Sequence, residues 1–425
     1  MTSTTLETPA RAVAATDGRA DGRADAAVFT GIGVAAPNGL GTEEWWRATL
    51  AGESGIGPVT RFDAAGYPAR LAGEVPGFEP EERLPSRLLP QTDHMTRLAL
   101  VAAEEALADA GADLAALDPH TAGVVTAASA GGFEFGQREL QALWSRGGQH
   151  VSAYQSFAWF YAVNTGQISI RHGLRGPSGV LVTEQAGGLD AVAQARRRLR
   201  RGAVLMVTGG VDGAICPWGW TAQLAGGRMS TASDPARAYL PFGAGARGHV
   251  PGEGGAVLIL EAGAAARARG ASVYGRLAGY AATFDPAPGR AGGPGLGRAA
   301  ELALQEAGLE PSAVDAVFAD AAGVPELDRI EAAALARVFG PRGVPVAVPK
   351  TMTGRLAAGG ASLDLAAALL SIRDGVLPPA ANLAEALPEY GIDLVTAARQ
   401  ARVRACLVLA RGQGGFNAAA VVTSA

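Results

Sequence analysis

Residues 181–191, LVTEQAGGLDA, form the kind of turn that can carry a catalytic nucleophile. The segment joins the end of an apolar strand to an amphipathic helix through small residues, so Gln185 is expected at a helix N-terminus. Unpaired backbone N–H groups and the positive end of the helix dipole would there lower a thiol's pKa and hold an oxyanion. Gln185 can neither ionise nor form a thioester. The turn therefore has the setting of a nucleophile without the nucleophile.

The helix after this turn is predicted from its apolar spacing to run toward Gly202. The residues expected on its buried face are Leu189, Val192, Ala195 and Leu199. Nearly continuous apolar runs occur before and after it, namely GVLVT, AVLMVTGGV, GAVLILE, VPVAVPK and ACLVLARG. Such runs are typical of strands covered on both faces by helices. We therefore predict an α/β protein.

An internal repeat predicts two related halves. Residues 102–111, AAEEALADAG, and 299–308, AAELALQEAG, share seven of ten positions, and each leads through a loop into an apolar strand. Ala-rich amphipathic helices also resemble one another by composition alone, so this alternative stays open. We expect βαβ-type halves over residues 27–265 and 266–425 that share one core, with ligands near the strand C-terminal ends. Residues 1–26 are expected to form a disordered tail.

Composition excludes several classes of function. The chain has 425 residues, of which 48% are hydrophobic, and its formal net charge of −4 gives no electrostatic footprint for nucleic acid or an acidic membrane surface. No run reaches the roughly 18 apolar residues of a membrane helix. Cys216 and Cys406 are too few for a disulfide framework and lack metal-ligand spacing. We therefore expect a metal-free protein of the reducing cytoplasm, with no nucleic acid or membrane partner.

From about Ala27 to the C-terminus the sequence resembles the β-ketoacyl synthase branch of the thiolase superfamily. That family carries a nucleophilic Cys at the position of Gln185 and two later His residues that assist decarboxylation and carbon–carbon bond formation. The family pattern N-A-H-G-T-x-T-P followed by Asp corresponds to VFADAAGVPELD, which has Asp320 at the His position. The retained residues of this frame are Ala319, Gly323, Pro325 and Asp328.

The second His position and the terminal loop are also changed. The pattern K-x-x-x-G-H-x-x-G-A corresponds to PKTMTGRLAAGGA, in which Lys350 and Gly354 are kept and Arg355 replaces His. The loop ARGQGGFNA has Gln413 where condensing enzymes usually carry a gating Phe. Its retained residues are Gly412, Gly414, Gly415 and Asn417. The last histidine of the chain is His249, so no later position can supply an imidazole.

This combination is similar to the chain length factors, or ketosynthase β subunits, of bacterial type II aromatic polyketide synthases. Gln at the nucleophile position is typical of them, and FAWFYAVNTGQISIRHG, CPWGW and VPGEGG fit the subfamily, although Cys216 replaces the commoner acidic residue. The resemblance implies a thiolase-like, five-layered αβαβα fold and no cofactor or metal. It also implies a heterodimer with a ketosynthase α subunit, an interface tunnel for the growing poly-β-keto chain, transient contact with an acyl carrier protein, and a role in limiting chain length.

The segment GGFEFGQRELQALW is the candidate tunnel wall. Phe133, Gly136, Leu140 and Leu143 recur at i, i+3, i+7 and i+10, so one helical face would present an aromatic ring, a gap and two aliphatic groups. An ordinary core face is the alternative. By resemblance, bulkier residues in this region accompany shorter products. Gly136 and Leu140 therefore predict a long tunnel, suited to about a decaketide or longer.

More than one role is open for the changed positions. The amide of Gln185 is either a neutral plug that caps a buried helix or the enolate-stabilising group of a malonyl-carrier-protein decarboxylase that primes the synthase. A scaffold that only stabilises its partner is a third possible function. If Asp320 and Arg355 stand where the two histidines would, their opposite charges should pair inside the closed site.

Two further segments are candidate partner surfaces. QSFAWFYAVN packs five aromatic residues into eight positions, a density typical of a buried partner surface or of core packing. These residues are Tyr154, Phe157, Trp159, Phe160 and Tyr161. Residues 196–201, RRRLRR, are expected to form a solvated helix C-terminus whose cations complement the dipole, with docking of an acidic carrier protein as the alternative.

Overall fold

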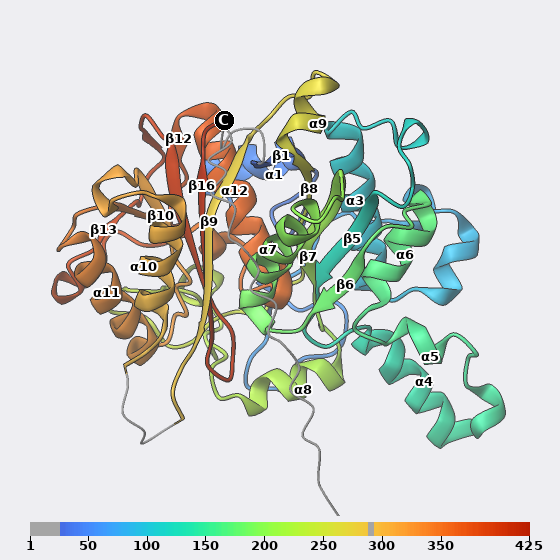
Figure 1. The fold of residues 1–425 in the computed structure, drawn as a ribbon. Helices are drawn as coiled ribbons and strands as arrows, with labels where there is room; N and C mark the ends of the chain where they lie inside the picture. The colour runs from blue at the N-terminus through green and yellow to red at the C-terminus, as the bar shows by residue number, and fades with distance from the viewer. Residues whose placement is uncertain (1–25, 288–292) are drawn as a thin grey trace, which may run out of the picture.

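The computed structural model of the protein describes residues 26–287 and 293–425. Its main sheet has the strand order β13-β11-β10-β15-β16-β9-β1-β8-β7-β5-β6, with β2 beside β1 (Figure 1). These strands are β1 (Ala27–Ala36), β2 (Gly39–Leu40), β5 (Ala122–Ala127), β6 (Ser178–Leu181), β7 (Leu205–Asp212), β8 (Gly254–Ala262), β9 (Gly275–Phe284), β10 (Ala316–Phe318), β11 (Pro345–Ala347), β13 (Asp393–Leu394), β15 (Ala405–Arg411) and β16 (Phe416–Thr423). The apolar runs predicted as strands are thus confirmed as β6, β7, β8, β11 and β15.

The helices lie mainly between these strands in sequence. They are α1 (Thr42–Leu50), α2 (Pro80–Arg83), α3 (His94–Asp109), α4 (Phe133–Arg146), α5 (Gln155–Ala158), α6 (Val163–His172), α7 (Gly187–Leu199), α8 (Pro217–Ala225), α9 (Gly263–Ala268), α10 (Leu296–Ala307), α11 (Pro325–Phe339) and α12 (Gly360–Asp374). Two small antiparallel pairs, β3 (Ile56–Pro58) with β4 (Leu71–Gly73) and β12 (Val376–Leu377) with β14 (Arg399–Gln400), stand apart from the main sheet.

The pairing pattern of the main sheet occurs twice. β1 pairs antiparallel with β8 and β8 with β7, followed by parallel β5 and β6. β9 pairs antiparallel with β16 and β16 with β15, followed by parallel β10 and β11. The two sets meet where Val28 and Phe29 pair with Arg276 and Gly275. The prediction of two related halves is confirmed. The boundary expected at residues 265 and 266 falls within α9, in the connection between the two sets.

Glycines at matching places let each half pack a helix on its first strand. A Cβ on Gly31 of β1 would lie 2.1 Å from the carbonyl oxygen of Ala106 in α3, and a Cβ on Gly279 of β9 would lie 2.1 Å from that of Ala303 in α10. Ala106 and Ala303 occupy the same position of the sequence repeat. Shared composition alone does not require this shared close approach, so the repeat reflects a repeated structure.

The helices and strands stack in five layers, as the resemblance implied. Helices α7 and α12 pack on each other at the centre, where their apolar side chains share one core with the inner faces of the strands (Figure 1). Helices α3 and α6 cover the outer face of the first set of strands. Helices α10 and α11 cover the outer face of the second set. The predicted buried face of α7 is confirmed, because Leu189, Val192, Ala195 and Leu199 are all buried.

Strand β6 departs from the prediction of strands covered on both faces. It stands at the edge of the sheet with β5 as its neighbour, and its residues are half-buried or exposed. Among the residues that the structure describes, no strand pairs with the outer edge of β6, so backbone N–H and C=O groups are left open there. Helices α4 and α5 project from the body of the molecule (Figure 1).

The remaining expectations concern the termini, membranes and cysteines. The tail expected over residues 1–26 lies outside the described residues except for Ala26. Among the described residues, no helix has the length and apolar character needed to cross a membrane. Cys216 and Cys406 are both free and buried.

Candidate functional site

Gln185 lies where two buried helices begin. β6 ends at Leu181, a 3-10 turn spans Glu184–Ala186, and α7 starts at Gly187. Helix α12 starts at Gly360, where an added Cβ would lie 2.2 Å from the side-chain amide of Gln185. Gln185 is therefore at a helix N-terminus, as predicted, and only 2% of its surface is exposed.

The amide of Gln185 has hydrogen-bond partners at both ends. With its oxygen toward the guanidinium, Oε1 accepts from Arg355 Nε at 2.9 Å and Nε2 donates to the carbonyl oxygen of Ala357 at 2.6 Å. The reverse orientation would set donor against donor and acceptor against acceptor. Both ends of the amide are thus occupied by protein groups, which leaves little capacity for bonding a substrate.

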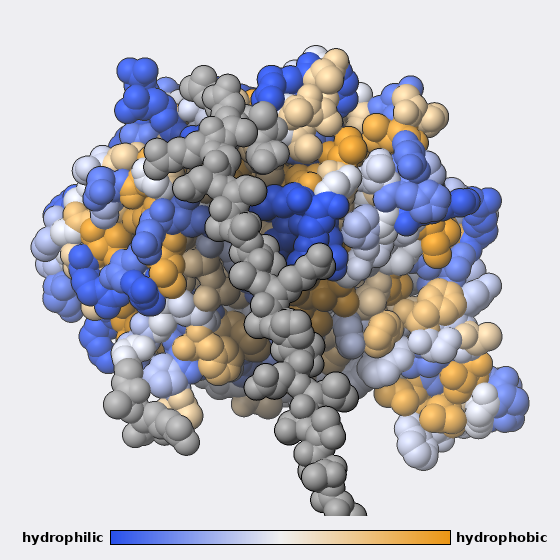
Figure 2. Space-filling view, in the orientation of Figure 1, coloured by the Kyte–Doolittle hydropathy of each residue, from blue (hydrophilic) through white to orange (hydrophobic). Residues whose placement is uncertain are grey.

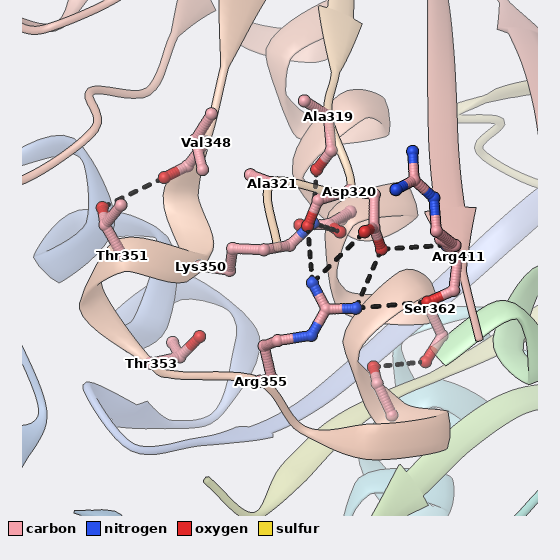
Figure 3. A network of polar contacts seen from close by, with 12 residues as sticks. Ala319, Asp320, Ala321, Val348, Lys350, Thr351, Thr353, Arg355, Ser362 and Arg411 are labelled. Carbon is pink, nitrogen blue, oxygen red and sulfur yellow. Dashed lines mark hydrogen bonds and ion pairs between the residues drawn. The ribbon is translucent and has the colours of Figure 1, made fainter. Parts of the chain in front are cut away.

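Arg355 and Asp320 form the buried ion pair that the sequence predicted (Figure 3). Nη2 of Arg355 lies 3.0 Å from Oδ1 of Asp320, and Nη1 lies 3.4 Å from Oδ2. The exposed fraction is 3% for the Asp320 side chain and 9% for the Arg355 side chain. The pair brings together the loop after β10 and the loop before α12, so it joins two segments of the second half.

Every nitrogen of the Arg355 guanidinium is engaged. Nη1 also donates to the carbonyl oxygen of Asp320 at 2.9 Å, and Nη2 donates to that of Arg411 at 3.2 Å. Oδ1 of Asp320 in turn accepts from the backbone N–H of Arg411 at 2.9 Å. The three changed positions are therefore linked by hydrogen bonds in the order Gln185, Arg355, Asp320. We call these three residues the buried network.

Lys350, a retained frame residue in the 3-10 turn Pro349–Met352, supports the network and is itself paired with a residue of α12. Its Nζ lies 2.6 Å from Oδ2 of Asp364 and donates to the carbonyl oxygen of Asp320 at 3.2 Å. A second, shorter hydrogen bond joins Nζ to the carbonyl oxygen of Ala319 (Figure 3). Lys350 thus fixes the backbone that carries the Asp320 carboxylate.

The charges around Asp320 decide its ionisation. Burial opposes the charged form, but the positive charges of Arg355, Lys350 and Arg411 hold the pKa of Asp320 below its usual value. Nearby Glu331 accepts the backbone N–H of Asp320 at 2.8 Å, and burial together with the charge of Asp320 raises the pKa of Glu331 to about 7. Asp320 is therefore an anion at neutral pH, unsuited to donate a proton.

The other retained residues shape the loops around the network. Asp328 accepts the backbone N–H groups of Phe242 and Gly323 at 2.9 Å each, and burial raises its pKa to about 6. Gly354 has φ +79°, and a Cβ there would lie 2.6 Å from the carbonyl oxygen of Val250. These residues hold the loop geometry rather than contribute chemistry.

The glycine-rich terminal loop packs against the Gln185 turn. A Cβ on Gly412 would lie 2.2 Å from a backbone oxygen of the turn, and Gly414 has φ +94°. The backbone N–H of Gln413 donates to Oε2 of Glu184 at 2.9 Å. Asn417 donates from Nδ2 to a carboxylate oxygen at 2.8 Å. The loop is thus fastened to the Gln185 turn at Gln413.

A cavity of about 80 Å³ remains beside the ion pair. Its charged and polar lining residues are Glu184, Gln223, Arg228, His249, Asp320, Arg355, Arg411 and Gln413. A space of this size has room for a few water molecules but not for a growing acyl chain. The side chains of the site therefore leave little free volume beside the ion pair.

His249 is a residue of this cavity that the sequence reasoning did not place there. It comes from the segment before β8 and forms a parallel bridge with Met229. Burial, followed by the positive charges of Arg355 and Arg228, lowers the pKa of His249 to about 3. No spacing relates it to the changed positions, so only the fold brings it there.

The predicted tunnel-wall residues lie on α4, but mostly not on the face that this chain buries. The buried residues of α4 are Phe135, Gly136, Glu139 and Ala142. Leu140 is 37% exposed, and Phe133 and Leu143 are half-buried. The alternative of an ordinary core face within this chain is therefore wrong for this set, apart from Gly136.

Trp218 of α8 covers the gap at Gly136. Its ring stacks on Phe133 with centroids 4.3 Å apart and planes at 21°. A Cβ on Gly136 would lie 3.2 Å from the Trp218 ring and 3.5 Å from Cβ of Trp159. Trp218 belongs to the segment CPWGW, and nothing in that segment predicts a contact with the candidate wall.

The two candidate partner surfaces differ in the structure. The five aromatic residues are each 38–43% exposed, and hydrophobic residues gather over the lobe formed by α4 and α5 (Figure 2). The expectation of a fully solvated arginine run is wrong for Arg196, which is buried and pairs with Glu306 of α10 at 2.8 Å. Arg197, Arg200 and Arg201 are exposed as expected.

The ion pair generates a prediction about stability. Arg355→Met should lower the free energy of unfolding by about 3–5 kcal/mol, because it leaves the Asp320 carboxylate buried without its guanidinium. The double variant Asp320→Asn/Arg355→Met should recover most of this loss. Urea unfolding measures both. Arg47→Met, which breaks an exposed ion pair with Glu53, is the matched control and should change little. Equal losses in the single and double variants would contradict the assignment.

His249 generates a prediction about pH. The unfolded chain protonates this imidazole below about pH 6.5, whereas the folded protein holds it neutral. Its stabilising contribution is therefore complete above that pH and is lost as the pH falls. Relative to His249→Gln, the free energy of unfolding of the wild type should fall by about 1.4 kcal/mol between about pH 7.5 and about pH 5.5. A difference independent of pH would show that His249 is freely solvated.

Comparisons with known proteins agree with this geometry. Residues 25–266 match the family model of the beta-ketoacyl synthase N-terminal domain, and residues 274–384 match that of the C-terminal domain. The chain is 62% identical over 398 residues to the tetracenomycin polyketide synthase ketoacyl synthase beta subunit of Streptomyces glaucescens, covering 93% of this chain and 97% of that protein.

Two solved structures are similar throughout. The ishigamide ketosynthase/chain length factor has a TM-score of 0.85 and 27% identity, covering 94% of this chain and 99% of the other. A type II polyketide synthase acyl-carrier protein in complex with its ketosynthase bound to the hexaketide gives a TM-score of 0.84 and 26% identity, with the same coverage. The chain belongs to the beta-ketoacyl synthase family, in the branch of the ketosynthase beta subunits of type II polyketide synthases.

Proposed function

We propose that this chain is the non-condensing subunit of a type II polyketide ketosynthase heterodimer, in which it limits the length of the poly-β-keto chain through the shape of an interface tunnel. The observation that carries the proposal is the buried network. Gln185, Asp320 and Arg355 hold one another where the family places its nucleophile and its two catalytic histidines. The described lining of the cavity includes no cysteine, serine, threonine or lysine that could bond to an acyl chain, so we assign this chain a steric influence.

The free surfaces of the chain support a heterodimer with an active ketosynthase. β6 has an open edge that could pair with a strand of a partner, and the five half-exposed aromatic residues would lose their contact with water there. The similar structure titled ketosynthase/chain length factor fits this arrangement. We place the heterodimer in the cytoplasm, where an acyl carrier protein would deliver the substrate and leave again.

The face of α4 supports the role in chain length. Leu140 and Trp144 line an open groove of about 730 Å³ together with Trp218. With Phe133 and Leu143 also incompletely covered, this face has space for a partner wall and an extended chain. The absence of a side chain at Gly136 and the aliphatic side chain of Leu140 favour a long product, about a decaketide or longer.

The decarboxylase alternative needs a free amide at Gln185. Its two hydrogen bonds, to Arg355 and Ala357, count against that role, because an enolate would have to displace one of them. A scaffold without a chemical role differs from the proposed function in one respect: only a tunnel wall should change the product when its side chains change.

Wall substitutions should change the product of the synthase. Leu140→Phe and Gly136→Phe should each shift the polyketides released toward shorter chains, because the added ring occupies space along the predicted tunnel; at Gly136 the ring must also displace Trp218. The measurement is the mass of polyketides from cells that co-express the cognate ketosynthase and carrier protein. Arg138→Phe, on the opposite side of α4, is the control. Unchanged products in assembled heterodimers would favour the scaffold.

Gln185→Ala should separate chain-length control from priming. In the reconstituted synthase we expect priming per assembled heterodimer to be retained, because the amide is assigned to structure. Release of labelled carbon dioxide from malonyl-carrier protein measures priming, and the heterodimer content is determined in parallel. A loss of decarboxylation without a loss of heterodimer would instead support the decarboxylase.

A further inference from the structure

The start of α4 is wedged against the end of α5. The backbone N–H of Gly132 donates to the carbonyl oxygen of Trp159 at 3.0 Å. A Cβ on Gly131 would lie 2.2 Å from that same oxygen, and a Cβ on Gly132 would lie 2.3 Å from the carbonyl oxygen of Ala158. Just before the candidate wall helix, therefore, there is no space for a side chain at either glycine.

Asp93 fastens the first turn of α4 from a distant element. It caps α3, where Oδ1 accepts the backbone N–H of Met95 at 3.0 Å, and its Oδ2 accepts the backbone N–H of Phe135 in α4 at 2.7 Å. Only 4% of Asp93 is exposed. One buried carboxylate thus satisfies orphan donors at the N-termini of two helices.

A second connection lies beside the first. Arg61 pairs with Glu134 of α4 at 2.9 Å and also with Glu253, whose side chain is almost fully buried. Beyond this first turn the helix reaches outward, and Trp144 near its far end is 84% exposed. Helix α4 is therefore strongly held at its N-terminal end, so a small shift or rotation of its first turn displaces the rest of the helix.

We propose that Asp93 is a positioning residue for chain-length control. It fixes the axial position and the rotation of α4, and so decides how Phe133, Gly136 and Leu140 face the tunnel. This inference rests on the proposed function. A rotation of α4 moves the wall residues relative to the growing chain without altering any of them, so the length at which the chain stops becomes less sharply defined.

The chemistry of the carboxylate suggests the variant. Burial raises the pKa of Asp93 to about 6, so at neutral pH the group is ionised and both oxygens accept. An asparagine has the same shape but one acceptor oxygen, and its NH₂ would face one of the two N–H donors. Asp93→Asn should therefore release either α3 or the first turn of α4.

The test compares Asp93→Asn with Asp113→Asn in the co-expressed synthase. Asp113 makes the matching capping bond to the backbone N–H of Ala115 at 3.0 Å, in an exposed 3-10 turn with no link to α4. In purified heterodimers we expect Asp93→Asn to lower the ratio of the main polyketide to its neighbours in length by about tenfold or more, since displacements of about 1 Å are costly in a positioned site. Asp113→Asn should leave the ratio unchanged.

Two further measurements keep the outcomes distinct. Faster hydrogen exchange at the Phe135 amide should accompany the broadened products, whereas faster exchange with an unchanged spectrum would overturn the proposal. If Asp93→Asn does not assemble with its partner, Glu134→Gln provides the test, because that side chain is 41% exposed and the substitution breaks only its ion pair with Arg61. A broader range of product lengths from Glu134→Gln supports the proposal, and an unchanged range rejects it. If Leu140→Phe also leaves the products unchanged, the proposed function itself fails.

Discussion

The buried ion pair between Asp320 and Arg355 is the interaction that holds the side chains of the pocket in place. Two charges withdrawn from water are tolerable only when each is paired and its remaining hydrogen-bonding groups are satisfied. Arg355 meets this condition through Gln185, Asp320 and the backbone of Arg411. Gln185 therefore accepts the hydrogen bond from Arg355 Nε that the other partners leave open. This role explains why a neutral amide suits a turn whose setting is that of a nucleophile.

Much of the fold could be predicted from local patterns. Continuous apolar runs indicated strands, and a repeated helix–loop–strand segment indicated duplication, because both are properties of short stretches of sequence. The edge position of β6 could not be predicted in this way, since GVLVT is as apolar as the central strands. Whether a strand is covered depends on its neighbours in space, and none of the described strands lies on the outer side of β6.

The candidate site was predictable where a frame of retained residues marked it. Lys350, Gly354 and Asp328 fixed the alignment of the two changed positions, and opposite charges at those positions predicted their contact. His249 and Trp218 were not predictable as site residues, because distant segments bring them to the cavity and to α4. The hydrogen bond between the Phe135 amide and Asp93 was not predictable either, because it joins two helices that lie far apart in the sequence.

The way in which the three network residues depend on one another has a consequence for any attempt to engineer condensing activity into this chain. Replacing Gln185 with cysteine would leave Arg355 Nε without its acceptor, and replacing Asp320 or Arg355 alone with a neutral histidine would leave the other charge unpaired in the interior. Each single replacement should therefore lower the stability of the protein before any activity could appear. All three positions would have to be exchanged together.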